Sequence, residues 1–351
     1  MLNPQYKITN KIFKSLTDVA EAKGIIEKAK LLPKHELKLK RQAMIRMSHS
    51  STSIEGNVLD IRQVEALYAN KKIDAPNRDI YEVQNYLKAL HFIEKFVKSE
   101  KTITKRILLK IHSLVTEKTL PDDQSGYFRK GPVYVVKRRL GFPDEIVYAG
   151  PKAISVPCLC NDLIEWINKS EKEEINPVIM AGIVHLEIAA IHPFNDGNGR
   201  TARALATLIL YKRGYDFRHL FALEDYYNKD LPSYYKAVNV GKNYEERKIE
   251  ITEWLEYFVE GFRDEIMNVK NQVMSLALRK MNKSIESQIY LTEKQQQILD
   301  FIEQLGRIKV GDVTDILKCP QRTAQMELQK LKKLGIIKSV GMGRATMYVL
   351  K

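Results

Sequence analysis

IHPFNDGNGRTAR, residues 191–203, lies between two strongly apolar segments, residues 179–191 and 204–210. Apolar segments of this kind are typical of buried helices. The polar residues between them are therefore predicted to form a loop that is fixed at both ends. Such a loop is a rigid base for a small set of functional groups.

The first residues of the second helix are suited to bind an anion. Backbone N–H groups of Gly197, Asn198 and Gly199 can converge on a phosphate, helped by the helix dipole. Arg200 and Arg203 lie three residues apart, so one helical turn places both near one face. Two guanidinium groups beside backbone amides suit a polyphosphate. We therefore predict a phosphate-binding loop here.

Two other side chains of the loop can take part in chemistry. Asp196 offers a hard oxygen ligand for Mg²⁺, the usual companion of nucleotide phosphates. His192 is the residue nearby that can take a proton at neutral pH. Phe194 is expected to anchor the loop in the core. His185 is interpreted as a packed structural histidine, because its surroundings do not match the H-E-x-x-H spacing of a metal site.

The segment resembles the motif of the Fic family, His-x-Phe-x-(Asp/Glu)-Gly-Asn-Gly-Arg-x-x-Arg, and matches it at every position. The resemblance extends over about residues 50–260. It implies an all-α fold, a helical bundle with a β-hairpin flap before the motif. It also implies transfer of AMP from ATP to a hydroxyl side chain of a target protein or of the chain itself, with release of pyrophosphate. Phosphate-transferring relatives lack the second glycine and the final arginine of the motif, and this chain has both.

The resemblance also assigns roles to individual residues. His192 is the implied general base and Asp196 the implied Mg²⁺ ligand. The implied ATP contacts come from Gly197, Asn198, Gly199, Arg200, Thr201, Ala202 and Arg203, with Tyr234 and Tyr235 near the nucleotide base. Residues 133–136 and 146–148 are β-prone and flank a Gly-Phe-Pro turn, which predicts a hairpin. The implied target-docking strand, which aligns the target by β-augmentation, contains Val133, Tyr134 and Val135.

A second motif precedes the hairpin. Ser51-x-x-x-Glu55-Gly56 resembles the family's inhibitory motif, (Ser/Thr)-x-x-x-Glu-(Gly/Asn). Gly56 is a natural helix stop, which places Glu55 on the last turn of a helix. Glu55 is predicted to pair with Arg203 and to take the place of the γ-phosphate. An isolated S-x-x-x-E-G would be only a helix-end carboxylate; the complete catalytic motif favours the inhibitory interpretation.

The last 60 residues are predicted to be a separate unit. Three helices followed by two strands, 336–337 and 347–350, indicate a winged helix-turn-helix domain. Its third helix opens with Gln321, Arg322, Thr323 and Gln325, and Lys330, Lys332, Lys333 and Arg344 could meet DNA phosphates. The alternative is a dimerisation or target-docking module. The predicted domains are an N-terminal region (1–60), a catalytic domain (61–265), a helical linker (266–290) and the winged helix (291–351).

Composition indicates the class of partner and the cellular compartment to expect. The chain has 351 residues, 57 Lys and Arg against 43 Asp and Glu, and a net charge of +14, which favours polyanionic partners. Three cysteines, Cys158, Cys160 and Cys319, are expected to be reduced thiols in a cytoplasmic protein. No transmembrane run or signal peptide is expected, and a homodimer is possible. The sequence is consistent with three candidate functions. These are an adenylyltransferase restrained by Glu55, a DNA-binding regulator with a nucleotide-binding Fic domain, and a relative that removes AMP or transfers another phosphate-linked group.

Overall fold

The computed structural model describes residues 2–99, 101–137, 145–281, 291–341 and 346–351. Helices dominate it, and the strands form two small antiparallel hairpins. The prediction of a helical fold with a β-hairpin flap is confirmed. The helices of the main body are α1 (Asn10–Lys28), α2 (Pro33–Ser53), α3 (Ile61–Tyr68), α4 (Asn77–Val97), α5 (Lys105–Val115), α6 (Val156–Lys172), α7 (Pro177–Ile191), α8 (Asn198–Lys212), α9 (Leu223–Lys229), α10 (Leu231–Val238) and α11 (Thr252–Met281). Short 3₁₀ turns are η1 (Ala153–Ser155) and η2 (Phe217–His219).

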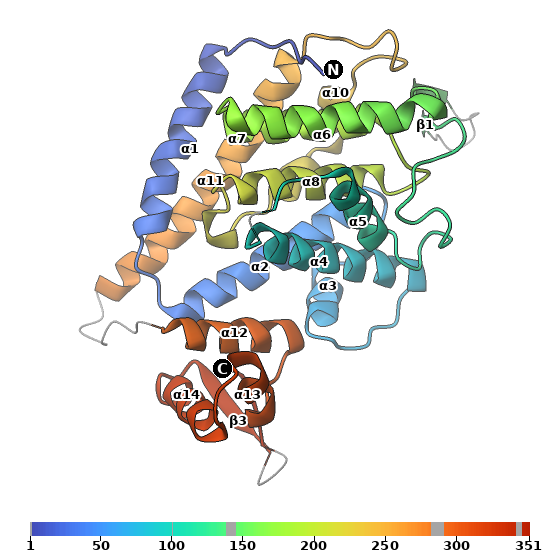
Figure 1. Cartoon of the computed structure of the whole chain (residues 1–351). Coiled ribbons are helices and arrows are strands. Elements are labelled where there is room, and N and C mark those ends of the chain that lie inside the picture. Colours follow the sequence, from blue (N-terminus) through green and yellow to red (C-terminus); the bar gives the residue numbers. More distant parts are fainter. Residues whose placement is uncertain (1, 100, 138–144, 282–290, 342–345) are drawn as a thin grey trace.

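Helix α7 lies at the centre of the main core. Almost all of its residues are buried, because the sequence from Val178 to Ile191 is apolar on every side. Asn176 caps its start and Pro177 occupies the first turn. The helix packs on α6, α8 and α11 (Figure 1). It ends at His192, which precedes Pro193 and adopts a left-handed conformation with φ 48°. The fold thus fixes His192 at a buried helix end.

The N-terminal helices belong to the same core as the catalytic loop. Ile12 and Ile26 of α1 are fully buried, and α1 runs beside α11 (Figure 1). Helix α11 is continuous over the predicted boundary at 265/266, and its Ile266 and Val273 lie in that core. The N-terminal helical region and the catalytic domain thus share one core, and α11 runs from the predicted catalytic domain into the predicted helical linker. The linker residues 282–290 lie outside the described part of the chain.

The flap consists of β1 (Tyr134–Lys137) and β2 (Glu145–Ala149), which pair antiparallel. Val133 precedes β1, and its carbonyl accepts a hydrogen bond from the Gly150 N–H at 3.1 Å. The outer edge of β2 meets the chain at Asn243 through an isolated bridge from Ala149. The described residues place no further strand on β1. The predicted Gly-Phe-Pro turn, residues 141–143, lies outside the described residues.

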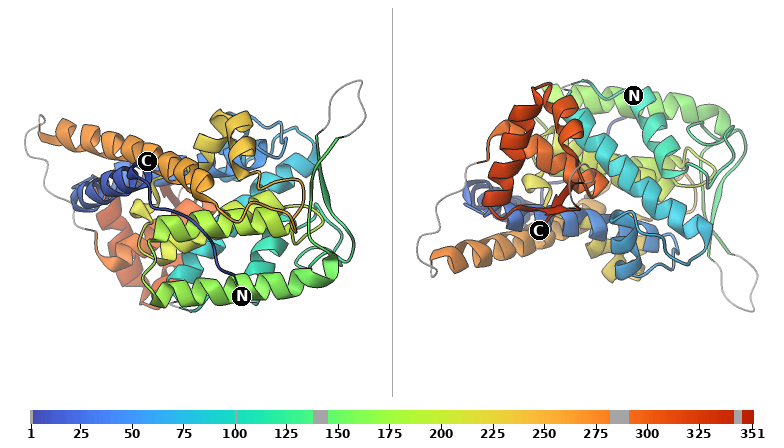
Figure 2. Two further views of the ribbon diagram at one scale, coloured as in Figure 1. Left: turned by 90° about the horizontal axis from the view of Figure 1, so that it is seen from above. Right: turned by 90° about the horizontal axis from the view of Figure 1, so that it is seen from below.

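The C-terminal unit has a core of its own. It comprises α12 (Glu293–Leu305), α13 (Val310–Leu317), α14 (Gln321–Lys333), β3 (Ile337–Val340) and β4 (Met347–Leu350). Thr292 and Gln295 form a capping box at the start of α12. The predicted order of three helices and two strands is present, while the winged-helix assignment stays a prediction. Leu37 of α2 packs against this core, and Figures 1 and 2 show the unit beside the start of α2.

Candidate active site

The loop between α7 and α8 is closed by its own side chains. The Phe194 N–H donates to Asn198 Oδ1, and Asn198 Nδ2 donates to the Phe194 carbonyl, both at 2.9 Å. The Asn198 side chain therefore helps to close the loop, while one of its two Nδ2 donors has no partner within the loop. Phe194 is fully buried, as expected, and its ring lies 3.6 Å from that of His112, nearly parallel. Gly197 has φ 77°, and a Cβ there would lie 2.7 Å from Thr116 Cγ2, so this position requires glycine.

His112 is a loop-positioning residue that the sequence alone did not reveal. Its Nδ1 accepts a hydrogen bond from the Gly126 N–H at 2.9 Å, so the proton of the neutral ring is on Nε2. That Nε2–H donates to the Asp196 carbonyl at 3.0 Å. Burial lowers the pKa of His112 to about 4, and the ring is therefore neutral near pH 7. The ring stack and this hydrogen bond fix both ends of the loop.

His192 has the electrostatics of a base. Its Nδ1 lies 3.2 Å from the Ala189 carbonyl, an arrangement in which Nδ1–H donates and Nε2 keeps a free lone pair. Burial lowers its pKa below the usual value, although the Ala189 hydrogen bond and the charge of Glu55 partly oppose this. Arg129, also missed in the sequence, donates from Nε to the His192 carbonyl at 2.8 Å and from Nη2 to the Pro151 carbonyl at 2.6 Å. The base is thereby tied to the chain at the foot of the flap.

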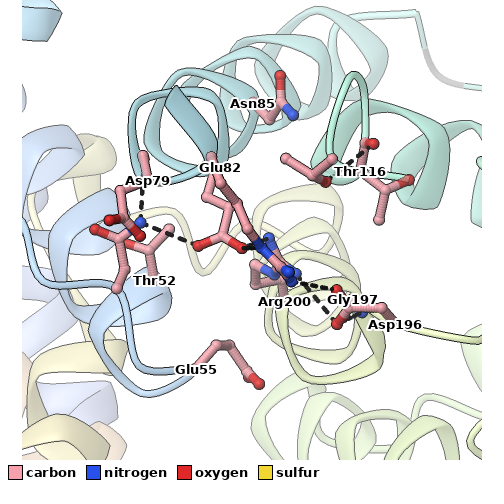
Figure 3. A network of polar contacts seen from close by, with 12 residues as sticks. Thr52, Glu55, Asp79, Glu82, Asn85, Thr116, Asp196, Gly197 and Arg200 are labelled. Atoms are coloured by element: carbon pink, nitrogen blue, oxygen red, sulfur yellow. Dashed lines mark hydrogen bonds and ion pairs between the residues drawn. The ribbon is translucent and has the colours of Figure 1, made fainter. Parts of the chain in front are cut away.

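Asp196 lies within a network of charged side chains. Its Oδ2 accepts from Arg78 Nη2 at 3.0 Å, and its Oδ1 lies 3.4 Å from Arg200 Nη2. The Arg200 side chain is 1% exposed and lies between Asp196 and Glu82, with Nη1 3.3 Å from Glu82 Oε1 (Figure 3). Its Nε and Nη1 have no hydrogen-bond partner in the structure. A buried guanidinium with unfilled donors fits a site that accepts an anion.

Arg203 is held by the segment that carries the second motif. Its Nε donates to Ser51 Oγ at 2.9 Å, and its Nη2 donates to the Ser51 carbonyl at 2.8 Å and to Glu55 Oε1 at 2.7 Å. The ion pair of Glu55 with Arg203 that the sequence predicts is therefore present. Burial lowers the pKa of Arg203, but the Glu55 carboxylate together with Tyr234 and Tyr86 outweighs this effect, and the net pKa is raised. Glu55 itself follows the last turn of α2, and Gly56 has φ 93°.

Glu55 also occupies the space beside Gly199. A Cβ on Gly199 would clash with Glu55 Oε1 and would lie 3.0 Å from Arg203 Nη1, which has no hydrogen-bond partner. The Glu55 carboxylate thus lies against the backbone from which the predicted phosphate cradle starts. Arg200 and Arg203, expected on one face, are bound by different partners: Arg200 by Glu82 and Asp196, Arg203 by Ser51 and Glu55.

The two tyrosines have different surroundings. Tyr234 is buried, stacks on Tyr227 and is 3.0 Å from His185 Nε2 through its hydroxyl. Tyr235 is 51% exposed and donates to the Ile54 carbonyl at 2.8 Å. Of the two tyrosines, only Tyr235 is accessible to a ligand, and it contacts the segment that carries Ser51 and Glu55. His185 is buried among aromatic rings, and burial lowers its pKa to about 3, as expected of a structural histidine.

The loop offers one carboxylate, that of Asp196, to a metal ion. Among the described residues, no group of three or more His, Cys, Asp and Glu side chains gathers as a metal cage. Mg²⁺ is commonly held by one or two carboxylates together with substrate phosphates, so a lone Asp196 beside the phosphate cradle fits Mg²⁺ bound with ATP. The cysteines are free thiols. No helix in the described part of the chain is long and apolar enough to cross a bilayer.

Fold and loop together define a Fic-type domain: a helical body, a small hairpin and the His192–Arg203 loop between two buried helices. Residues 102–210 match the model of the Fic/DOC family, so the chain carries a Fic domain. A protein adenylyltransferase Fic from Aedes aegypti is 30% identical over 178 residues, which are 50% of this chain and 34% of that protein. One from Culex quinquefasciatus is 30% identical over 178 residues, with 33% of its length covered. The chain thus spans about a third of these relatives.

Solved structures show the same fold. A Fic family protein from Desulfovibrio desulfuricans has a TM-score of 0.63 at 23% identity, and the match covers 100% of this chain and 98% of that one. Fic-1 from C. elegans has a TM-score of 0.58 at 23% identity, with 78% of this chain and 74% of that one covered. At these identities the likeness concerns the fold.

Proposed function

We propose that this protein is an adenylyltransferase that moves AMP from ATP to a hydroxyl side chain of a target protein or of itself. The observation that carries the proposal is the geometry of residues 192–203. A half-buried histidine with a free Nε2 lies at one end of the loop, and a helix start with two arginines lies at the other. The similarity of half the chain to proteins named adenylyltransferases supports it.

The residues imply the following reaction. His192 Nε2 accepts the proton of the target hydroxyl, and the hydroxyl oxygen forms a bond to the α-phosphorus of ATP. The bond from that phosphorus to the bridging oxygen breaks, and pyrophosphate leaves with the electron pair. The backbone at Gly197–Gly199 and the two arginines stabilise the negative charge of the phosphates. Exposed β1 residues offer a strand edge along which an extended target segment aligns.

Asp196 is the residue that would hold Mg²⁺, and the ion would neutralise phosphate charge. Arg78 occupies Asp196 in this structure, and its side chain is 65% exposed. An exposed arginine can turn towards solvent at small cost, so Asp196 becomes free when the nucleotide arrives.

Glu55 restrains the proposed reaction. Its carboxylate takes the Arg203 guanidinium and the space over Gly199 that a phosphate needs. Arg–carboxylate and Arg–phosphate pairs compete for the same donors. The resting protein is therefore restrained, and activity requires that Glu55 moves.

Mass spectrometry tests the proposal. The Glu55→Gly protein is incubated with ATP and a cell lysate, and modified hydroxyl side chains are identified by the added AMP. The His192→Ala variant in the same background should lose at least about 100-fold in rate, as expected for removal of a general base. Modification by a group other than AMP, or removal of AMP from modified proteins, would favour the third function. Equal rates with and without His192 would contradict the assigned base.

A second candidate function is DNA binding by the C-terminal unit. The observation that favours it is the exposure of Gln321, Arg322 and Gln325 at the start of α14, together with Lys332 and Lys333 at its end. The first turns of such a helix are where base contacts are made in helix-turn-helix proteins.

A further inference from the structure

Glu82 contacts Arg200 of the loop, Arg78, which pairs with Asp196, and Asn57, which follows Glu55. This buried carboxylate of α4 is 5% exposed. Its Oε1 lies 3.3 Å from Arg200 Nη1 and 3.2 Å from Arg78 Nε. Its Oε2 accepts a hydrogen bond from Asn57 Nδ2 at 3.0 Å. Figure 3 shows Glu82 between the turn after α2 and the start of α8.

Asn57 belongs to the segment that restrains Arg203. It lies two residues after Glu55 and is buried. Its amide donates to the Asp79 carbonyl and to Glu82, and its Oδ1 accepts from the Leu59 N–H at 3.1 Å. Every polar atom of this side chain is therefore in use, and the position of Asn57 is tied to that of Glu82. The inhibitory segment thus reaches Arg203 directly through Glu55, and Arg200 indirectly through Asn57 and Glu82.

Arg200 depends on Glu82 more than a surface arginine would. The guanidinium is almost fully buried, and its partners are Glu82 and Asp196, the second of which is also bound to Arg78. When Asp196 binds Mg²⁺ together with the phosphates, Glu82 is the remaining carboxylate that orients Arg200. A charged group with one fixed partner keeps its direction, and its remaining donors stay free for an anion.

We propose that Glu82 is a positioning residue that aims Arg200 at the ATP phosphates, and that Asn57 couples Glu82 to the inhibitory segment. This rests on the proposed function, because it assumes that ATP is the ligand. Both motif arginines are then under control of the segment 51–57, so movement of that segment changes the whole phosphate site. Glu82 touches no reacting atom and acts through Arg200.

The role of Glu82 is tested by measuring ATP binding. Calorimetry is carried out with Mg²⁺ in the Glu55→Gly background. Glu82→Gln should weaken ATP binding by about 10- to 100-fold, the size of one or two hydrogen bonds to a charged group. Glu82→Asp, which keeps the charge, should recover part of the affinity. In turnover assays, KM for ATP should rise more than kcat falls.

A matched control separates positioning from stability, because loss of any buried carboxylate partner destabilises the fold. Glu187 is 4% exposed and pairs with Arg247 at 2.9 Å. Glu187→Gln should lower Tm as Glu82→Gln does, yet leave ATP affinity unchanged. An equal loss of ATP affinity in the Glu187 variant, or unchanged affinity in folded Glu82→Gln, would overturn the proposal.

Asn57→Ala tests the coupling and provides a second variant should Glu82→Gln fail to fold. A double-mutant cycle compares Asn57→Ala, Glu82→Asp and the double variant. The ATP affinity of the double variant should differ by at least about 2-fold from the value expected if the two single effects were additive. Additive effects would overturn the coupling. If the Glu55→Gly protein binds no ATP at all, the proposed function fails first and this proposal with it. Unchanged binding in the Glu82 variants overturns this proposal alone.

Discussion

At the scale of single residues, the site is a competition for two arginines. Arg203 has Ser51 and Glu55 as partners, and one of its nitrogens, Nη1, stays unpaired beside Gly199. Arg200 is shared between Glu82 and Asp196. The protein therefore meets the need of buried guanidinium groups for counter-charges in the absence of nucleotide, and a nucleotide must replace some of these contacts.

Replacing Glu55 by Gly should raise AMP transfer by about 5- to 150-fold, which corresponds to a coupling of about 1–3 kcal/mol. The reason is that both Arg203 Nη2 and the space over Gly199 become free. Incorporation of label from radioactive ATP measures the effect. A Glu173→Gly control removes an exposed carboxylate that pairs with Lys169 of α6, and neither residue belongs to α2 or to the loop. Equal activity of the Glu55 variant and the parent would refute the restraint.

The pH dependence of the reaction should report His192. Its pKa is lowered, and a base works in its neutral form, so activity is present above the pKa and is lost as pH falls through it. The midpoint of the acid limb of kcat/KM should therefore lie below about 6.5, the usual histidine value. Since the Glu55 charge raises this pKa, the midpoint in the Glu55→Gly variant should fall further. A midpoint at or above 6.5 in that variant would contradict the geometry.

How far the sequence predicts the site depends on the distance of each contact along the chain. His192, Asp196 and Arg203 could be proposed from the sequence because the motif places them in one short segment. Glu82 and His112 were missed, since their partners in the loop, Arg200 and Asp196, lie more than 80 residues away and their helices have ordinary amphipathic patterns. Asn198 has a further role that its type did not predict, because its side chain closes the loop around Phe194.

At the scale of elements, α2 connects the Ser51–Glu55 segment, which pairs with Arg203, to the main body of the protein. Arg46 pairs with Asp225 at 2.8 Å and with Glu265 at 3.0 Å, and Ser50 Oγ donates to Asp225 at 2.5 Å. These contacts fix α2 on α9 one turn before Ser51. Sequence patterns predicted the helix, although it ends at Ser53 and not at Gly56. They did not predict the side chains of α9 and α11 that hold it, because such pairings depend on tertiary packing.

Loosening this contact should weaken the restraint. Asp225→Ala removes the partner of both Arg46 and Ser50, so α2 should leave Arg203 more often and AMP transfer should rise by about 2- to 10-fold. Label incorporation is measured in the parent and in Glu55→Gly. The increase should appear only in the parent, since the second background has no restraint left to lose. An equal increase in both would show that Asp225 acts on catalysis by another route.

At the scale of the whole molecule, the C-terminal unit contacts the start of the helix whose other end restrains Arg203. Leu37 packs against the core of that unit, while Ser51 lies at the far end of the same helix. A partner of the C-terminal unit would thus bind to a unit that is itself in contact with α2. The net charge of +14 favours a polyanion as that partner.

If the partner is duplex DNA, its affinity should fall steeply with salt. Binding that neutralises about four phosphates should weaken by about 100-fold between 50 and 200 mM salt, because each neutralised phosphate releases counterions. Arg322 and Lys333 are exposed at opposite ends of α14, so Arg322→Ala and Lys333→Ala should each reduce the slope of log affinity against log salt by about 1. Lys248→Ala, an exposed lysine of the main body, is the control and should leave the slope unchanged. Fluorescence anisotropy with a mixed-sequence duplex measures all of these affinities. Absent or salt-independent binding would favour a protein-docking role for the C-terminal unit. The contact at Leu37 would then connect α2 to a protein-binding unit instead of a DNA-binding one.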